Sequence, residues 1–452
     1  MTKQTLCLCA TLLISSVALA DTGTTTVPGK DLGKTIDKVN YVETDVPGVR
    51  LNGYVDVGYT YNFIGAGSQV TNRFSQDSHS AGDFNVNAVK LTLEKPLSDK
   101  NELQAGFRVD AMLGEDAAAD ANDNYSTALL QGLNGDGTQG HASSFFVEQA
   151  YVTIRVPYGN GIDFKVGKQV SWLGYEAVER PSNLNITYGN LFQNMTPLSG
   201  TGVSAEYKFC DIVDAGLKVT NGWDADTNGG QSFDIGTPVN DGYAIEAKLN
   251  IKNKAGNANI QQSVFYTWDS SYLITRDQGV AQYNNGNAVV YDVWGNWAPK
   301  CTRDKLLLGF NTDLGFAEID SWPHANDTTT TTWWGAALYA KYQFNSIYSL
   351  AARADYIHTD DSGQKFGAGY PTNGGGSAQN FGGYLAGYNN EDIWSLTLTN
   401  GFNIVDNLLL RAEYRVDIGD DVTRTTKLNG FGNPLGTGNI ANTVSVEAVY
   451  TF

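Results

Sequence analysis

Apolar and polar residues alternate with a period of two along most of this chain. In residues 49–63, Leu51 and Val55 fall on one face and Asn52 and Asp56 on the other. Successive side chains of a β-strand point to opposite faces, so this segment is predicted to be a strand with one apolar and one polar side. The dominant period is therefore that of a sheet, not the 3.6 residues of a helix.

The same alternation recurs often enough to build a closed sheet. It predicts sixteen strands, an even number, as bacterial single-chain outer-membrane barrels have. The predicted strands are 49–63, 83–97, 102–113, 145–156, 162–171, 201–209, 213–223, 241–252, 257–269, 287–298, 304–320, 332–344, 347–359, 391–404, 407–419 and 441–452.

The connections between these strands alternate in length. Seven short turns, such as 98–101 and 345–346, are interleaved with eight long loops, such as 114–144 and 360–390. Transmembrane barrels have this asymmetry, with short periplasmic turns and longer extracellular loops. We therefore predict an all-β fold, a single transmembrane, antiparallel, up-and-down β-barrel of about sixteen strands with short periplasmic turns and long extracellular loops.

The polar side of the strands is charged, which indicates the medium that it faces. In 407–419, acidic and basic residues alternate along one side and apolar residues along the other. Such charges are costly to bury in a dry core. A water-filled lumen accommodates them, while lipid covers the apolar side. The residues predicted to line the lumen are Arg353, Asp355, Arg411, Glu413, Arg415 and Asp417.

The first twenty residues predict export. Lys3 precedes a mostly apolar run, and residues 18–20 have the A-x-A pattern of a cleavage site. The run is shorter than the roughly 20 residues that a spanning helix needs. We assign 1–20 to a signal peptide, 21–48 to a periplasmic N-terminal lead-in, and 49–452 to the outer-membrane barrel. The lead-in is expected to be a flexible linker, with a short helix or a partial plug as alternatives.

Charge limits the possible partners. The 452 residues include 30 Lys+Arg and 48 Asp+Glu, a net charge of −18. A nucleic-acid binder needs a basic surface, so no nucleic-acid partner is expected. More than half of the net negative charge falls in the long loops, whereas the charges predicted for the lumen are nearly balanced. An acidic rim concentrates cations, which predicts a mild preference for cations.

Several segments resemble one protein family. They include LNGYVDVGYTYNF at 51–63, FVEQAYVTIRVPYGNGIDFKVGK at 146–168 and DNLLLRAEYRVD at 406–417. In order and spacing they are similar to the outer-membrane porin family called putative β-barrel porin-2, OmpL-like, from Leu51 to Phe452. The resemblance implies an outer-membrane barrel that passes small solutes, without naming a substrate. Phe452 also resembles the terminal signal that the barrel-assembly machinery reads.

The third long loop, 172–200, is the candidate for a pore constriction. In general sixteen-stranded porins the corresponding loop folds into the lumen. Its acidic residues would then face basic residues of the wall, and opposed charges across a pore sort solutes by charge. The alternative is a loop over the barrel mouth, with its arginine paired to a neighbouring glutamate. The predicted constriction residues are Glu176, Glu179, Arg180, Lys90, Arg108 and Lys165.

Signals for enzymes and metals are weak. The four histidines lie in or beside long loops, and neither HExxH nor GxSxG occurs. The acidic residues of 114–144, Asp116 among them, lack the spacing of a calcium loop, so a solvated acidic loop is expected. The predicted function is a non-enzymatic channel, a porin for passive diffusion of small hydrophilic solutes, without cofactor or metal site.

Two other functions remain open. One is a non-conducting barrel that acts as an adhesin or structural protein, and the other is an outer-membrane protease or lipase with a dispersed site. The expected partners are outer-membrane lipid and lipopolysaccharide, the barrel-assembly machinery and small hydrophilic solutes. By analogy with other sixteen-stranded porins, a homotrimer is also expected.

Overall fold

The computed structural model describes residues 42–44, 46–64, 68–70, 81–117, 145–222, 243–277, 280–303, 305–321, 327–359, 392–425 and 437–452. Within these ranges, no helix combines the length and the apolar character needed to cross a membrane. The predicted signal peptide, 1–20, and the lead-in as far as residue 41 lie outside the described residues.

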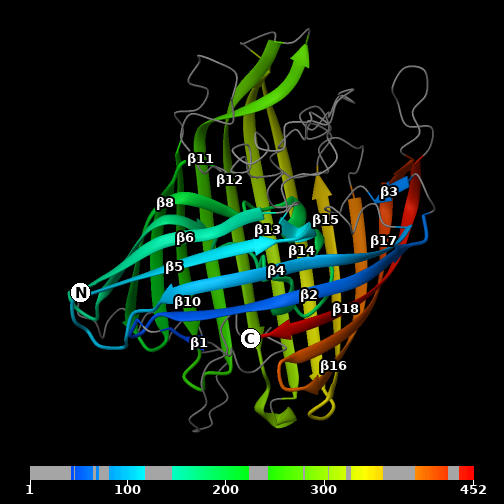
Figure 1. Cartoon of the computed structure of the whole chain (residues 1–452). Coiled ribbons are helices and arrows are strands. Elements are labelled where there is room, and N and C mark those ends of the chain that lie inside the picture. The colour runs from blue at the N-terminus through cyan, green and yellow to red at the C-terminus, as the bar shows by residue number, and fades with distance from the viewer. Residues whose placement is uncertain are drawn as a thin grey trace.

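Sixteen long antiparallel strands form one closed sheet (Figure 1). Each pairs with its neighbours in chain order, and the ring closes where β18 pairs with β2, from Thr443 opposite Asn62 to Thr451 opposite Tyr54. This confirms the predicted all-β barrel. The long strands are β2 (Arg50–Asn62), β4 (Ala81–Lys95), β5 (Gln104–Leu113), β6 (Phe145–Val156), β7 (Ile162–Val170), β8 (Ser199–Cys210), β9 (Val213–Thr220), β10 (Tyr243–Lys252), β11 (Ala258–Asp277), β12 (Val280–Trp297), β13 (Leu306–Ser321), β14 (Asp327–Gln343), β15 (Tyr348–Thr359), β16 (Asp392–Val405), β17 (Leu408–Thr425) and β18 (Thr437–Thr451).

Two short strands extend the barrel wall at its two rims. β1 (Val42–Glu43) pairs with the start of β2, so the end of the predicted lead-in is joined to the wall. β3 (Ser68–Val70) pairs with the outer end of β17 at residues 423–425. Both pairings satisfy backbone groups that would otherwise lack strand partners.

Two of the predicted long loops are largely strand. β11 continues to Asp277 and β12 begins at Val280, which replaces most of the predicted loop 270–286. β14 likewise begins at Asp327, inside the predicted loop 321–331. Lipid imposes alternation only on the part of a strand that it touches. Strand extensions beyond the bilayer can therefore lack the pattern from which strands were predicted.

The two faces of the sheet differ as a membrane barrel requires. Tyr414 is 46% exposed on the outside, whereas the next residue of β17, Arg415, is fully buried. Most of the exposed large hydrophobic residues lie at such outward positions on the strands, and most buried charged residues lie at inward positions. A soluble protein buries its apolar side instead. The outer surface is thus suited to lipid.

Residues 171–198, called here the lumen segment, connect β7 to β8 and fold into the ring of strands. The segment contains a 3₁₀ turn, η3 (Arg180–Ser182), and one short helix, α5 (Asn190–Asn194). α5 lies against β14 and β15, and every residue from Asn183 to Leu198 is buried. The segment therefore packs on the inner wall.

Candidate functional site

Glu413, on β17, holds the middle of the lumen segment. Its carboxylate accepts hydrogen bonds from the backbone amides of Ile186 (2.5 Å) and Thr187 (3.1 Å) and from the Thr187 hydroxyl (2.6 Å). The Thr399 hydroxyl, on β16, donates to the same carboxylate (2.7 Å). Hydrogen bonds to an ionised acceptor are stronger than neutral ones. One wall residue thus satisfies two amides that have no strand partner.

Three arginines of β15 and β17 bind carbonyl oxygens of the lumen segment. Arg353 donates to the carbonyl of Thr187 (2.6 Å), and Arg415 donates to the carbonyl of Tyr188 (2.5 Å). Arg411 donates to three further carbonyls of the segment. The guanidinium group has five donors in a fixed plane, which suits it to bridge several carbonyls at once. The segment is therefore held by wall charges on both its amides and its carbonyls.

The six residues predicted to line the lumen point inward, yet each is at most 3% exposed. Asp355 accepts a hydrogen bond from the side-chain amide of Asn190 (2.6 Å), and Asp417 accepts one from Arg415 (2.9 Å). This corrects the expectation that they contact water, because the lumen segment covers the wall at β15–β17. Their charges bind protein groups instead.

Glu176 faces a different part of the wall from the predicted one. Its carboxylate lies 2.7 Å from Arg353 and accepts a hydrogen bond from the backbone amide of Gly189 (2.6 Å). Burial raises the pKa of Glu176 above its ordinary value, and the charge of Arg353 opposes that rise. The predicted partners on β4, β5 and β7 are replaced by a partner on β15.

Glu179 does face the predicted basic residues. Its carboxylate lies 2.7 Å from the Lys90 ammonium and 3.9 Å from the Arg108 guanidinium. Burial disfavours the ionised carboxylate, but the nearby Lys90 outweighs this and lowers the pKa of Glu179 to about 2. An acidic residue of the lumen segment is therefore opposed to two basic residues of β4 and β5.

Arg180 and Lys165 have other partners. Arg180 donates to Asp116 (2.9 Å), a buried residue in the connection that follows β5. The expectation that Asp116 belongs to a solvated acidic loop is thus wrong, since it neutralises an arginine inside the barrel. The rest of that loop, 118–144, lies outside the described residues. Lys165, on β7, pairs with Glu206 of β8 (2.8 Å).

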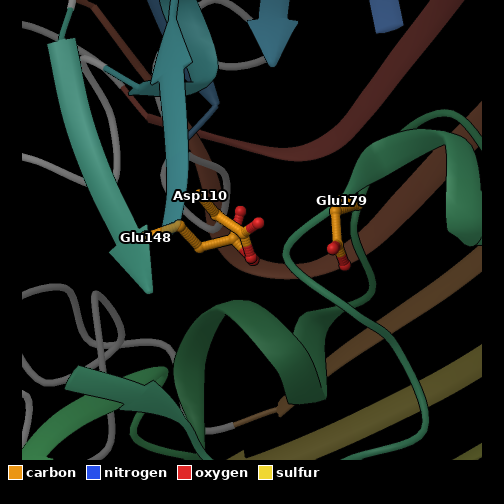
Figure 2. A group of neighbouring side chains, drawn as sticks. All are labelled: Asp110, Glu148 and Glu179. Carbon is orange, nitrogen blue, oxygen red and sulfur yellow. The ribbon is translucent and has the colours of Figure 1, made fainter. Parts of the chain in front are cut away.

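Asp110, Glu148 and Glu179 approach one another with one carboxylate oxygen each, within 4.8 Å (Figure 2). The Lys90 ammonium lies 2.6 Å from Glu148, 2.7 Å from Glu179 and 3.8 Å from Asp110. It supplies the positive charge that a metal ion would otherwise bring. The cluster is therefore an ion-pair network around a lysine, and it ties the lumen segment to β4.

The opposite part of the wall keeps charged side chains in contact with solvent. Arg108 and Glu179 are 28% and 25% exposed, and Lys165 and Glu206 are 27% and 25% exposed. The lumen is thus asymmetric. The lumen segment covers the charges of β15–β17, while charged residues of β5, β7 and β8 remain accessible.

Apolar contacts inside the barrel were not predicted from the sequence. The Trp333 indole donates to the carbonyl of Met195 (3.2 Å), and both side chains are fully buried. Ile357 and Ile393 belong to the same apolar cluster. The adjacent Trp333 and Trp334 could have indicated an apolar contact inside the barrel. Neighbouring residues of a strand face opposite sides, so one of the two must point inward.

These features define a class of protein. A closed ring of sixteen antiparallel strands, apolar outside and charged inside, with the connection 171–198 folded into the lumen, is the architecture of an outer-membrane porin. Residues 48–452 match the family described as putative beta-barrel porin-2, OmpL-like. The chain belongs to this family and is an outer-membrane barrel of the channel-forming kind. No curated protein matches it significantly.

Solved structures share the fold at low sequence identity. The outer membrane channel DcaP of Acinetobacter baumannii is 13% identical, with a TM-score of 0.54 over 91% of this chain and 99% of that one. An anion-selective porin from Comamonas acidovorans is 12% identical, with a TM-score of 0.54 over 89% and 99%. Pseudomonas putida OprB is 13% identical, with a TM-score of 0.51 over 90% and 94%.

Proposed function

We propose that this porin is a passive diffusion channel for small hydrophilic solutes, narrowed on one side by the lumen segment. The observation that carries this proposal is the asymmetry of the lumen. Charges on β15 and β17 are covered by the segment, whereas Arg108, Lys165 and Glu206 keep solvent contact on the other side. Solutes would pass along that accessible side.

The predicted constriction residues then divide into two groups. Glu179 and Arg108 place opposed charges beside the solute path, with Lys165 further along the wall, and such charges sort solutes by sign. Lys90, which is buried, holds Glu179 in this position. Glu176 and Arg180 instead hold the lumen segment in place through Arg353 and Asp116. Selectivity is assigned to the first group, of which Glu179 also ties the lumen segment to β4, and only stability of the constriction is assigned to the second.

A mild preference for cations is the second part of the proposal. The net charge of −18 and its concentration in the long loops support it. The anion-selective porin from Comamonas acidovorans has a similar fold, so placement of charge, and not the fold, has to decide the sign. A reversal potential measured across a KCl gradient tests this directly, and one that favours chloride would refute it.

Targeting and assembly complete the proposal. Residues 1–20 would be removed as a signal peptide, 21–48 would form the periplasmic lead-in, and the barrel-assembly machinery would insert the barrel among lipid and lipopolysaccharide.

A homotrimer is expected by analogy with other sixteen-stranded porins. A neighbouring copy at β9 is supported by the length of this strand, which has 8 residues against 20 in β11. A strand of that length, tilted by about 40°, spans about 20 Å, less than the apolar band of about 25 Å. A neighbouring copy would cover the mismatch.

The decisive experiment is reconstitution of the purified barrel. Discrete conductance steps in planar bilayers are expected, together with liposome swelling rates that fall with the size of the sugar or amino acid supplied. A correctly folded barrel without conductance steps would overturn the channel and favour an adhesin or structural protein. Peptidase and phospholipase assays on the same sample test the enzymatic alternative.

A further inference from the structure

Three glycines lie at inward positions of the wall beside the lumen segment. They are Gly216 on β9, Gly309 on β13 and Gly335 on β14, and all three have ordinary extended φ values. Their backbones would accept any side chain. Glycine weakens the interior of a strand, and it is found there where another group approaches closely. The presence of glycine at these three positions therefore has to be explained by a lack of space for a side chain.

The space is taken by side chains of the lumen segment. A Cβ atom at position 309 would lie 2.7 Å from Tyr175 Cζ, and the next two nearest atoms also belong to Tyr175. A Cβ at 216 would lie 2.7 Å from Trp172 Cη2. One at 335 would lie 2.8 Å from Met195 Sδ and 2.9 Å from the backbone oxygen of Tyr356, so the wall also takes part of the space there. Non-bonded heavy atoms pack best at about 3.5–4.0 Å, so each of these Cβ atoms would clash.

The inserted side chains have further contacts with the wall. The Tyr175 ring stacks on Tyr339 with a centroid distance of 4.3 Å, and its backbone amide donates to Asn311 (2.8 Å). Trp172 lies beside two lysine ammonium groups, 4.3 and 4.4 Å from its ring centroid. Trp172 and Tyr175 stand at the start of the lumen segment and Met195 near its end. The segment is therefore anchored on both sides of its charge-bound middle.

We propose that Gly216, Gly309 and Gly335 are positioning residues of the channel. They are sockets whose missing side chains let the lumen segment lie flat against β9, β13 and β14, and this placement sets the width of the accessible side. The inference rests on the proposed channel function. A side chain in a socket would push the segment toward the accessible side and narrow the pore.

The test compares Gly309→Val with Gly401→Val in planar bilayers. Position 401 also faces inward, but the nearest atoms to a Cβ there belong to the wall, Ser349 Oγ at 2.8 Å and Leu409 Cδ1 at 4.0 Å. Gly309→Val is expected to lower single-channel conductance by about twofold or more, because the segment moves into the path of ions. Gly401→Val is expected to conduct as the unaltered protein does.

A second substitution that restores conductance to Gly309→Val gives a sharper test. Adding Tyr175→Ala to Gly309→Val frees the socket for the new side chain, so conductance should return toward that of Tyr175→Ala alone. The socket assignment is overturned if Gly309→Val conducts normally, or if Tyr175→Ala fails to suppress its defect. Should Gly309→Val not fold, Gly216→Val with and without Trp172→Ala provides the same comparison.

A second readout does not depend on conduction. Unfolding temperature, followed by the shift in gel migration on heating, should fall more for Gly309→Val than for Gly401→Val and recover with Tyr175→Ala. If the unaltered protein gave no conductance steps, the channel proposal would fail. The comparison of unfolding temperatures would still test whether the three glycines position the lumen segment. Equal unfolding temperatures for the two glycine variants would overturn them.

Discussion

The guanidinium of Arg353, on β15, lies 2.7 Å from the carboxylate of Glu176 in the lumen segment, and both side chains are shielded from water. Removing one partner of a buried ion pair leaves the other uncompensated and typically costs about 3–5 kcal/mol. Arg353→Met should therefore lower the free energy of unfolding by about that amount. Urea titration in detergent micelles measures it.

The double variant is the control for this pair. Combining Arg353→Met with Glu176→Gln removes one of the two carboxylates that lose their partner, the other being Asp355, 3.0 Å from Arg353, so part of the lost stability should return. A double variant as unstable as Arg353→Met alone would mean that the carbonyl contacts of Arg353 and its pairing with Asp355, and not its pairing with Glu176, carry the effect.

Glu413→Gln should loosen the middle of the lumen segment. The substitution replaces the ionised acceptor of four hydrogen bonds by a neutral amide, and bonds to charged groups are worth about 1.5–3 kcal/mol each. The expected result is lower stability and a noisier open-channel current. Glu318→Gln, at an exposed position of β13, is the control and should change neither. Unchanged current noise in Glu413→Gln would contradict the assigned role.

Glu179 and Glu176 should differ in their effect on ion selectivity. Glu179 is 25% exposed beside Lys90, whereas Glu176 is 3% exposed beneath Arg353. Glu179→Gln should therefore shift the reversal potential in a KCl gradient toward anions, while Glu176→Gln should leave it in place. If the two variants shifted it equally, the accessible side would not be the path of ions.

Glu179 should lose its charge only at low pH. Because Lys90 keeps its pKa at about 2 in the folded protein, below the ordinary value, its ionised form stabilises the fold above the unfolded pKa of about 4.3. This contribution is lost as pH falls from that value toward 2. The stability difference between the unaltered protein and Glu179→Gln should be constant from pH 7 to 5 and shrink below. A difference that already shrinks between pH 7 and 5 would contradict the lowered pKa.

The lipid-facing surface gives the simplest test of orientation. Leu338, in the middle of β14, is 65% exposed. Arg at the bilayer midplane of a barrel costs about 2–4 kcal/mol, so Leu338→Arg should destabilise the barrel in lipid bilayers by this amount. Ile347→Arg, in the short turn before β15, should cost only about 0–1 kcal/mol. Equal effects of the two would argue against lipid contact at Leu338.

The number and direction of the strands were predictable because lipid imposes a strict alternation on every strand. Tyr414 and Arg415 show how directly that rule translates into exposure. The same rule cannot tell what covers an inward side chain. Water and a folded segment both accept a charged residue, so Arg353 and Arg108 have similar patterns in sequence although only Arg108 is accessible.

The partners inside the lumen could not be predicted for a second reason. Glu176 and Glu179 are three residues apart, yet they bind strands on different sides of the lumen, because the chain turns between them without regular structure. Pairing across the lumen depends on that turn. Trp333 and Met195, which are far apart in sequence, meet for the same reason, and strand alternation holds no information about them.

The pairing of β18 with β2 has a consequence for biogenesis. The earliest and the latest long strands are neighbours, so a nascent polypeptide that stops short of β18 has two open edges with unsatisfied backbone groups. Such an intermediate is unstable in lipid, because its open edges have unsatisfied backbone groups, and it is prone to aggregate in water. Premature termination or proteolytic cleavage that removes the last strand should therefore be far more toxic to the cell than a deletion of the same length in an outer loop.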